Sequence, residues 1–122
     1  MRKTLLALVL IVTPIILSAQ APIGIPTSKF AWNEDAPTLA DVQGYTYKYY
    51  LDGAVAGVAF VGVVCSGAAS PFSCEVNIPA FTPGNHSITY TAQNIAGESS
   101  KSLPFGFAFV VTPAIPSGMR IK

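Results

Sequence analysis

Hydrophobic and polar residues alternate with a period of two in two runs of this chain, and turn residues end both runs. In residues 44–53, Tyr45, Tyr47 and Tyr49 alternate with other side chains, and an Asp-Gly pair closes the run. In residues 85–94, apolar or aromatic side chains at every second position alternate with Ser, Thr and Gln. Such alternation is typical of a strand with one buried face. We therefore predict two half-buried strands, the first with these three tyrosines facing the core.

Four other segments also favour strands, because they contain alternating aromatic residues or β-branched runs between turn residues. They are residues 29–35, residues 54–65 with a break at Gly62, residues 73–81 and residues 103–111. Phe30 and Trp32 share one face of the first segment, and Phe105, Phe107 and Phe109 share one face of the last. The second segment is too rich in Gly and β-branched residues for a helix.

Turn residues separate these segments at intervals of about 8–12 residues, and no amphipathic helix is expected between them. Residues 36–43 and 66–72 are predicted as loops, and the Pro-containing residues 20–28 and 112–122 as an extended lead-in and tail. About six or seven short strands with this spacing are typical of a β-sandwich. We predict an all-β sandwich as one domain at residues 29–111.

The N-terminal residues have the features of a secretory signal peptide. Arg2 and Lys3 precede an uncharged apolar run of about 13 residues, and the small residues Ser18 and Ala19 follow it. A membrane-spanning helix needs roughly 20 apolar residues, so a permanent anchor is the weaker interpretation. We predict cleavage after Ala19, with Ala21 as the alternative. The protein is then secreted, periplasmic or at the cell surface, with no membrane association after cleavage.

The charge of the chain gives little indication of a partner. Charged residues make up 11% of the sequence and hydrophobic residues 51%, and the formal net charge is +1. Removal of the leader would leave five basic residues against six acidic ones, a net charge of −1. A nearly neutral chain gives no electrostatic case for nucleic acid as a partner.

Short motifs in a fixed order make residues 29–111 resemble a fibronectin type III or closely related immunoglobulin-like domain. The motifs are Trp32, Gly44-Tyr45, Phe81-x-Pro83-Gly84, Ala92-x-Asn94 and Gly97-Glu98-Ser99. In that family, such motifs mark the second strand, the third strand, both ends of the sixth strand and the turn into the last strand. The resemblance implies a sandwich whose binding residues lie on the loops at its ends.

The chain departs from this family pattern before Trp32 and in the tail. Only the Pro-containing residues 21–28 precede Trp32, so the first strand is expected to be short or missing. A missing first strand leaves the edge of its neighbour unpaired. Residues 113–122 resemble the opening of another such domain. We therefore expect residues 119–121 to pair along an open edge, either of the same molecule or of a neighbour.

Cys65 and Cys74 are the only cysteines, with eight residues between them. This spacing is too wide for a Cys-x-x-Cys redox pair, and a zinc site needs about four ligands, to which only His86 could add a further soft ligand. An exported chain meets an oxidising compartment, which favours a disulfide. We predict a disulfide across the hairpin that the flanking strands form, worth roughly 2–3 kcal/mol.

The residues that could carry chemistry have simpler structural interpretations. His86 is the only histidine, and the adjacent Ser87 would face the opposite side of the strand, so we expect a strand residue rather than a catalytic base. Glu34, Asp35 and Asp41 lack the ligand spacing of a calcium loop, so we expect a solvated turn. Tyr50 is expected on the outer face of its strand. We therefore predict no catalytic residue, no metal site and no cofactor.

The sequence favours an exported, non-catalytic binding or structural module with a protein or carbohydrate partner. The candidate contact residues on the end loops are Glu34, Asp35, Asp41, Ser66, Pro71, Phe72, Asn94 and Glu98. The alternative is a self-assembling structural subunit of a cell surface or virion, which would associate through an edge strand or through the tail. A small hydrolase is a remote alternative, because one histidine and six scattered acids do not indicate a catalytic cleft.

Overall fold

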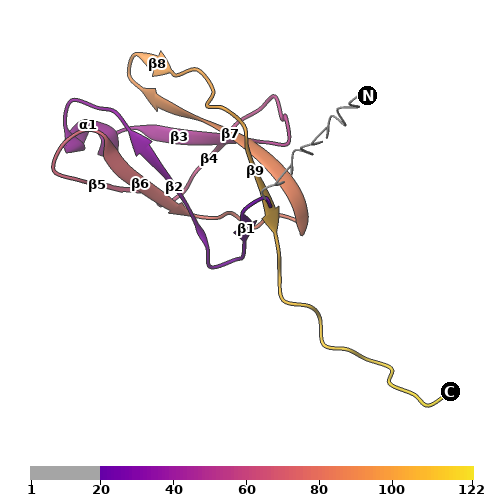
Figure 1. Cartoon of the computed structure of the whole chain (residues 1–122). Coiled ribbons are helices and arrows are strands. Elements are labelled where there is room, and N and C mark those ends of the chain that lie inside the picture. Colours follow the sequence, from indigo (N-terminus) through magenta and orange to yellow (C-terminus); the bar gives the residue numbers. More distant parts are fainter. Residues whose placement is uncertain (1–19) are drawn as a thin grey trace, which may run out of the picture.

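The computed structural model describes residues 20–122, which form two β-sheets packed face to face (Figure 1). The strands are β1 (Ile23–Gly24), β2 (Lys29–Glu34), β3 (Thr46–Leu51), β4 (Val58–Ala59), β5 (Val64–Ser66), β6 (Phe72–Asn77), β7 (Gly84–Asn94), β8 (Gly97–Glu98) and β9 (Phe105–Phe109), and the helix is α1 (Leu39–Gln43). The predicted leader, residues 1–19, lies outside the described residues. Within the described part, no helix is long and apolar enough to cross a membrane.

The strands are divided between a larger and a smaller sheet. The larger sheet has the order β1-β9-β7-β3-β4, with β8 paired to β7, and the smaller sheet has the order β2-β6-β5. The pairing of β1 with β9 is parallel, and the other pairings are antiparallel. The predicted all-β sandwich is therefore confirmed. The expected shortening of the first strand is also observed, because β1 contains only two residues.

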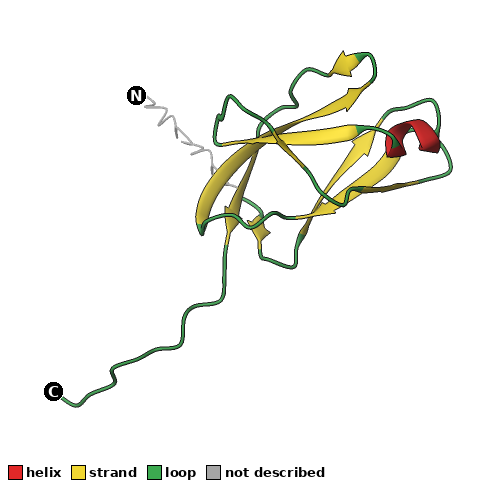
Figure 2. Ribbon diagram, turned by 180° about the vertical axis from the view of Figure 1, so that it is seen from behind, coloured by secondary structure: helices red, strands yellow, loops and turns green. Residues whose placement is uncertain are grey.

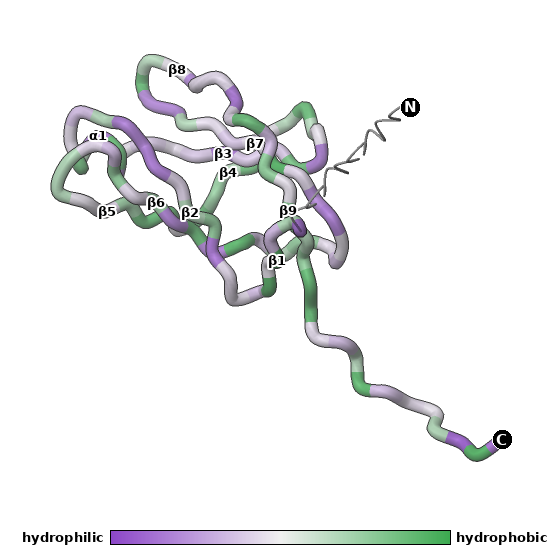
Figure 3. The backbone as a smooth tube through the Cα atoms, viewed as in Figure 1, coloured by the Kyte–Doolittle hydropathy of each residue, from purple (hydrophilic) through white to green (hydrophobic). Residues whose placement is uncertain are grey.

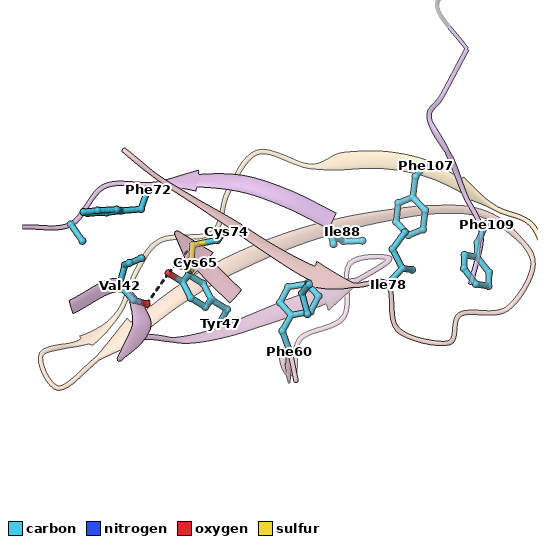
Figure 4. Close-up of a cluster of buried hydrophobic side chains, with 12 residues drawn as sticks. Val42, Tyr47, Phe60, Cys65, Phe72, Cys74, Ile78, Ile88, Phe107 and Phe109 are labelled. Carbon is cyan, nitrogen blue, oxygen red and sulfur yellow. Dashed lines mark hydrogen bonds between the residues drawn. A yellow bond between two sulfur atoms is a disulfide. The ribbon is translucent and has the colours of Figure 1, made fainter. Parts of the chain in front are cut away.

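The core between the sheets consists largely of aromatic rings, and it confirms the inward faces that the alternation predicts. Tyr47, Phe107 and Phe109 are almost fully buried (Figure 4). The ring of Phe30 contacts the ring of Phe107 at 5.3 Å, and Trp32 contacts Tyr47 at 5.1 Å, with steep interplanar angles in both pairs. Edge-to-face pairs of this kind stabilise a core beyond the area that they bury.

Cys65 and Cys74 form the predicted disulfide. The two residues lie directly opposite each other on β5 and β6, and both are buried. The sulfur of Cys74 lies 3.8 Å from the hydroxyl of Tyr47, whose hydroxyl is also within 3.5 Å of the carbonyl of Val42 (Figure 4). The bridge therefore joins two strands of the smaller sheet and packs in the core against the larger sheet and α1.

Residues 36–43 are not simply a loop, because they include the short helix α1, the only helix of the described chain (Figure 2). Thr38 is its N-cap, and the hydroxyl of Thr38 accepts a hydrogen bond from the backbone N–H of Asp41. Side-chain capping of this kind satisfies one of the unpaired N–H groups in the first helical turn. The helix buries Val42 completely, and this burial explains why the segment folds back onto the core.

The strand predicted over residues 54–60 is shorter than expected, because only β4, Val58–Ala59, pairs with β3. Asp52 and Gly53 form the predicted turn, both with positive φ, and the predicted break at Gly62 also has a positive φ. Beyond the turn, Gly57 packs so closely on Tyr50 that a Cβ atom there would lie 2.7 Å from the ring. The segment therefore covers Tyr50 instead of continuing the ladder.

The tail extends away from the sandwich in both views (Figures 1 and 2). Residues 110–122 form no strand with the rest of the described chain. The expected pairing within the same molecule is therefore not observed, and pairing with a neighbour remains a prediction. Hydrophobic and hydrophilic positions alternate near the end of the tail, where Met119 and Ile121 are fully exposed (Figure 3).

Candidate functional site

An open hollow of about 340 Å³ lies at the end of the sandwich where β2 and β7 finish and β8 begins. It is lined by Glu34, Asp35, Tyr45, Ala92, Gln93, Asn94, Ala96, Gly97, Glu98 and Ser99. Four of the eight predicted contact residues, Glu34, Asp35, Asn94 and Glu98, therefore lie together. Segments from both sheets form its walls, so the fold brings these residues together from distant parts of the sequence. We refer to it as the loop-end hollow.

The loop of residues 67–71 is joined to one wall of the loop-end hollow by hydrogen bonds. The hydroxyl of Ser70 donates to the Asp35 carboxylate at 3.0 Å and accepts from the backbone N–H of Ala36 at 3.4 Å. Pro71 follows Ser70 through a cis peptide bond and is exposed beside this contact. Ser66 is also exposed, on β5, but it does not line the hollow.

A second open hollow, of about 400 Å³, lies beside the first and shares Tyr45 and Asn94 with it. Asp41 lines this second hollow, together with Pro37, Ala40, Gly44 and Ile95. The carboxylate of Asp41 accepts a hydrogen bond from the Thr38 hydroxyl at 2.8 Å, so this acid is part of the cap of α1. Asp41 is therefore near the other candidate residues but has a structural role of its own.

Phe72 must be removed from the predicted contact residues. Its side chain is 3% exposed and belongs to the core, in the first position of β6. The positions of β6 are alternately buried and exposed, and Phe72 lies on the same face as Cys74 and Val76. A partner could reach Phe72 only if the end of the core opened.

The carboxylates of the loop-end hollow differ in their electrostatic environment. Partial burial, followed by the neighbouring charge of Asp35, raises the pKa of Glu34 above its ordinary value. Hydrogen bonds from Thr91 and Tyr50 lower the pKa of Glu98. The Glu98 carboxylate is thus held in its charged form, whereas the Glu34 carboxylate takes up a proton more readily than a solvated one.

The hairpin that carries β8 is held against the outer face of the larger sheet by Glu98. The Tyr50 hydroxyl and the Thr91 hydroxyl both donate to Oε1 of Glu98, the latter at 2.6 Å. The ammonium group of Lys101 lies 4.1 Å from the centre of the Tyr50 ring. Tyr50 points away from the core as predicted, but it is only 8% exposed because this hairpin and Gly57 cover it. Tyr50 is therefore not an exposed platform for a sugar.

His86 lies at the opposite end of β7 and forms a closed pair of contacts. Its Nδ1 is 2.7 Å from the Asp52 carboxylate, and its Nε2 is 2.7 Å from the carbonyl oxygen of Thr82. Both partners are acceptors, so both ring nitrogens donate, and these contacts raise the pKa of His86, with Asp52 as the larger cause. The ring is therefore favoured in its charged form. In that form neither ring nitrogen has a free lone pair with which to act as a base.

The acids considered for calcium are not gathered into a coordination site. Across residues 20–122, no group of three or more His, Cys, Asp and Glu side chains lies in an arrangement that could hold a metal ion. Glu34 and Asp35 line one hollow and Asp41 lines the other.

The chain was compared with family models, curated proteins and solved structures, and none of them matches it.

Proposed function

We propose that this chain is an exported, non-catalytic binding or structural module, built as a fibronectin type III-like sandwich, that contacts a protein or carbohydrate through its loop end. The observation that carries this proposal is the loop-end hollow, where Glu34, Asp35, Asn94 and Glu98 converge around an open space of about 340 Å³. Loops positioned by a rigid sandwich are the usual place for binding residues.

The positions of the family-like motifs support the fibronectin type III part of the proposal. Trp32 is on β2, Gly44-Tyr45 leads into β3, and Pro83-Gly84 leads into β7. Ala92 and Asn94 end β7, and the Gly97-Glu98 pair forms β8, ahead of the last strand. The motifs follow the order of the resemblance, although those expected at the sixth strand bracket β7 and the expected turn is the short strand β8. The disulfide supports export, because such bridges persist in oxidising compartments.

Structural roles for the ionisable groups support a non-catalytic function. Glu98 is engaged by two hydroxyl groups, and His86 is engaged at both ring nitrogens. General acid–base catalysis needs a group that can exchange a proton with a substrate within hydrogen-bond reach. Side chains whose polar atoms already form hydrogen bonds within the protein are poorly placed to exchange a proton with a substrate.

Nuclear magnetic resonance titration tests the binding proposal at single residues. Cellotetraose, chitotetraose and a short Lys-Gly repeat peptide serve as probes for neutral sugars, acetylated sugars and basic segments. We expect one probe to shift the amide signals of residues 34–35 and 94–98, and the change Asp35→Ala to weaken that shift. Shifts confined to other surfaces, or none with any probe, would contradict contact through the loop end.

Self-assembly is a second candidate function, and a separate observation favours it. The strand β2 has only one partner in its sheet within the described residues, while the tail exposes apolar side chains. An unpaired edge strand is a template for pairing with another chain.

A further inference from the structure

The free edge of β2 presents an ordered row of backbone donors and acceptors. The N–H of Ile78 donates to the carbonyl of Ser28 at 3.0 Å, so these opposite residues form a hydrogen-bonded pair. Such pairs alternate with non-bonded pairs in an antiparallel ladder, so Phe30 and Trp32 also direct their backbone groups to β6. The residues whose backbone groups point to the free edge are Lys29, Ala31 and Asn33.

The other edges of the sandwich are short or covered, in contrast to β2. On β5, the backbone of Cys65 faces outward, but Gln43 of α1 donates to its carbonyl at 3.4 Å. The edge strands of the larger sheet, β1 and β4, contain two residues each. Short or covered edges are common protections against association. Among the described elements, β2, with six residues, is thus the one long edge without such protection.

A groove of about 500 Å³ runs beside this edge, between β2 and the segment that leads into β9. Its walls are mainly apolar and consist of Lys29, Phe30, Ala31, Trp32, Phe60, Ile88, Tyr90, Ser102, Leu103, Pro104 and Phe105. The indole N–H of Trp32 is buried and has no hydrogen-bond partner within residues 20–122. An unpaired buried donor is destabilising, so an occupant with an acceptor would be favoured there.

The tail has the pattern and charge of a strand that could occupy this groove. Ile115, Met119 and Ile121 are at least nine-tenths exposed, and the last two alternate with Arg120 and Lys122. Residues 112–122 have a formal net charge of +2, whereas residues 20–111 have three lysines against six acids, a net charge of −3. Eleven extended residues reach roughly 36 Å, enough to run along a six-residue strand of about 20 Å.

We propose that residues 112–122 of one copy insert beside β2 of a second copy, as a donated strand that completes the smaller sheet. Met119 and Ile121 then face the groove, and the outward N–H and C=O groups of β2 gain backbone partners. The inference deepens the self-assembly function and rests on it. It is independent of the loop-end hollow, which shares no lining residue with the groove.

A second copy is the favoured acceptor because of where the tail leaves the sandwich. Val110 donates its N–H to the carbonyl of Gly24, so the tail starts beside β1, and β1 and its following turn separate that point from β2. The tail then runs away from its own body (Figure 1). Donation to a second copy closes into a dimer if the two copies exchange tails, and it otherwise continues head to tail as a ring or an open chain.

Proline substitutions on two edge strands test the acceptor side with a matched control. Ala31→Pro removes an outward N–H from β2 and places a proline ring on the free edge. Ala59→Pro makes the same change on β4, where the N–H also points outward because Phe60 bonds to Tyr47. Proline is tolerated on edge strands at such positions. Light scattering after size-exclusion chromatography, over a wide range of protein concentration, reports the mass of each variant.

We expect the native chain and Ala59→Pro to gain mass with concentration, and Ala31→Pro to associate about tenfold more weakly. A mixture of Ala31→Pro with a chain lacking residues 112–122 should favour a one-to-one heterodimer, because one partner donates a tail but accepts weakly and the other can only accept. A native chain that stays monomeric, equal assembly of both proline variants, or no heterodimer would overturn the proposal. None of these results would change what the titration at the loop-end hollow shows, because the two sites share no lining residue.

A donor-side variant keeps the test decisive if Ala31→Pro disturbs folding. Met119→Ser with Ile121→Ser changes only exposed tail residues, so the sandwich itself is not altered. We expect this double variant to remain monomeric, whereas the control Met119→Leu with Ile121→Leu assembles as the native chain does. Native-like assembly of the serine variant would overturn the role of the tail.

Discussion

The disulfide between Cys65 and Cys74 should supply a measurable part of the stability of the sandwich. The two residues are nine positions apart. Closing a loop of that length removes about 2.6 kcal/mol of chain entropy from the unfolded state at 25 °C in the loop-closure model. Replacing both residues with alanine should therefore lower the free energy of unfolding by about this amount. The melting temperature should fall by roughly 10–20 °C for a domain of this size.

Urea denaturation followed by circular dichroism measures this loss, with the neighbouring cross-strand pair as the control. Ser66 and Ser73 lie opposite each other on the same two strands, and both are exposed. The change Ser66→Ala with Ser73→Ala removes two side-chain hydroxyls from the same ladder without breaking a cross-link, so it should have little effect. A double cysteine variant within about 0.5 kcal/mol of the native protein would refute the entropic argument.

Three further predictions concern the core and the polar contacts. Phe72→Ala should cost about 3–5 kcal/mol of unfolding free energy in urea, because the ring is 3% exposed; a loss below about 1 kcal/mol would contradict its place in the core. Gly57→Ala should cost roughly 1–3 kcal/mol by the same assay, because the new Cβ would lie 2.7 Å from the Tyr50 ring; unchanged stability would show that this segment does not pack on Tyr50. The contact between His86 and Asp52 raises the histidine pKa, so its stabilisation is complete below the ordinary value of 6.5 and is lost as pH rises through the raised pKa. The native melting temperature should therefore fall more steeply above neutral pH than that of His86→Gln, and parallel pH profiles would contradict this.

The sequence predicts those features of the fold that depend on local alternation. Tyr45, Tyr47 and Tyr49 face the core as expected, because a strand with one buried face must place every second residue there. The alternation around Cys74 likewise places its side chain inward, within reach of Cys65. The same rule applied two residues back from Cys74 would have placed Phe72 in the core. The predicted loop over residues 66–72 therefore extends one residue too far, because Phe72 already belongs to β6.

Other features depend on contacts between distant segments and cannot be read from alternation. Tyr50 lies on the predicted outer face, yet Glu98, 48 residues away, folds back to bond with it. The helix α1 is too short for a helical period, and only the Thr38-x-x-Asp41 spacing indicates a cap. The loop-end hollow unites residues that the sequence singled out separately, because their meeting depends on the order of the strands.

Amide hydrogen exchange at Ala31 tests most directly whether a second copy completes the β2 edge. Its N–H points to the free edge in the single chain, as does that of Ala59 on β4. We predict that exchange at Ala31 slows as protein concentration rises, while exchange at Ala59 stays fast, and that removal of residues 112–122 abolishes the difference. Exchange at Ala31 that is independent of both concentration and the tail would contradict strand donation.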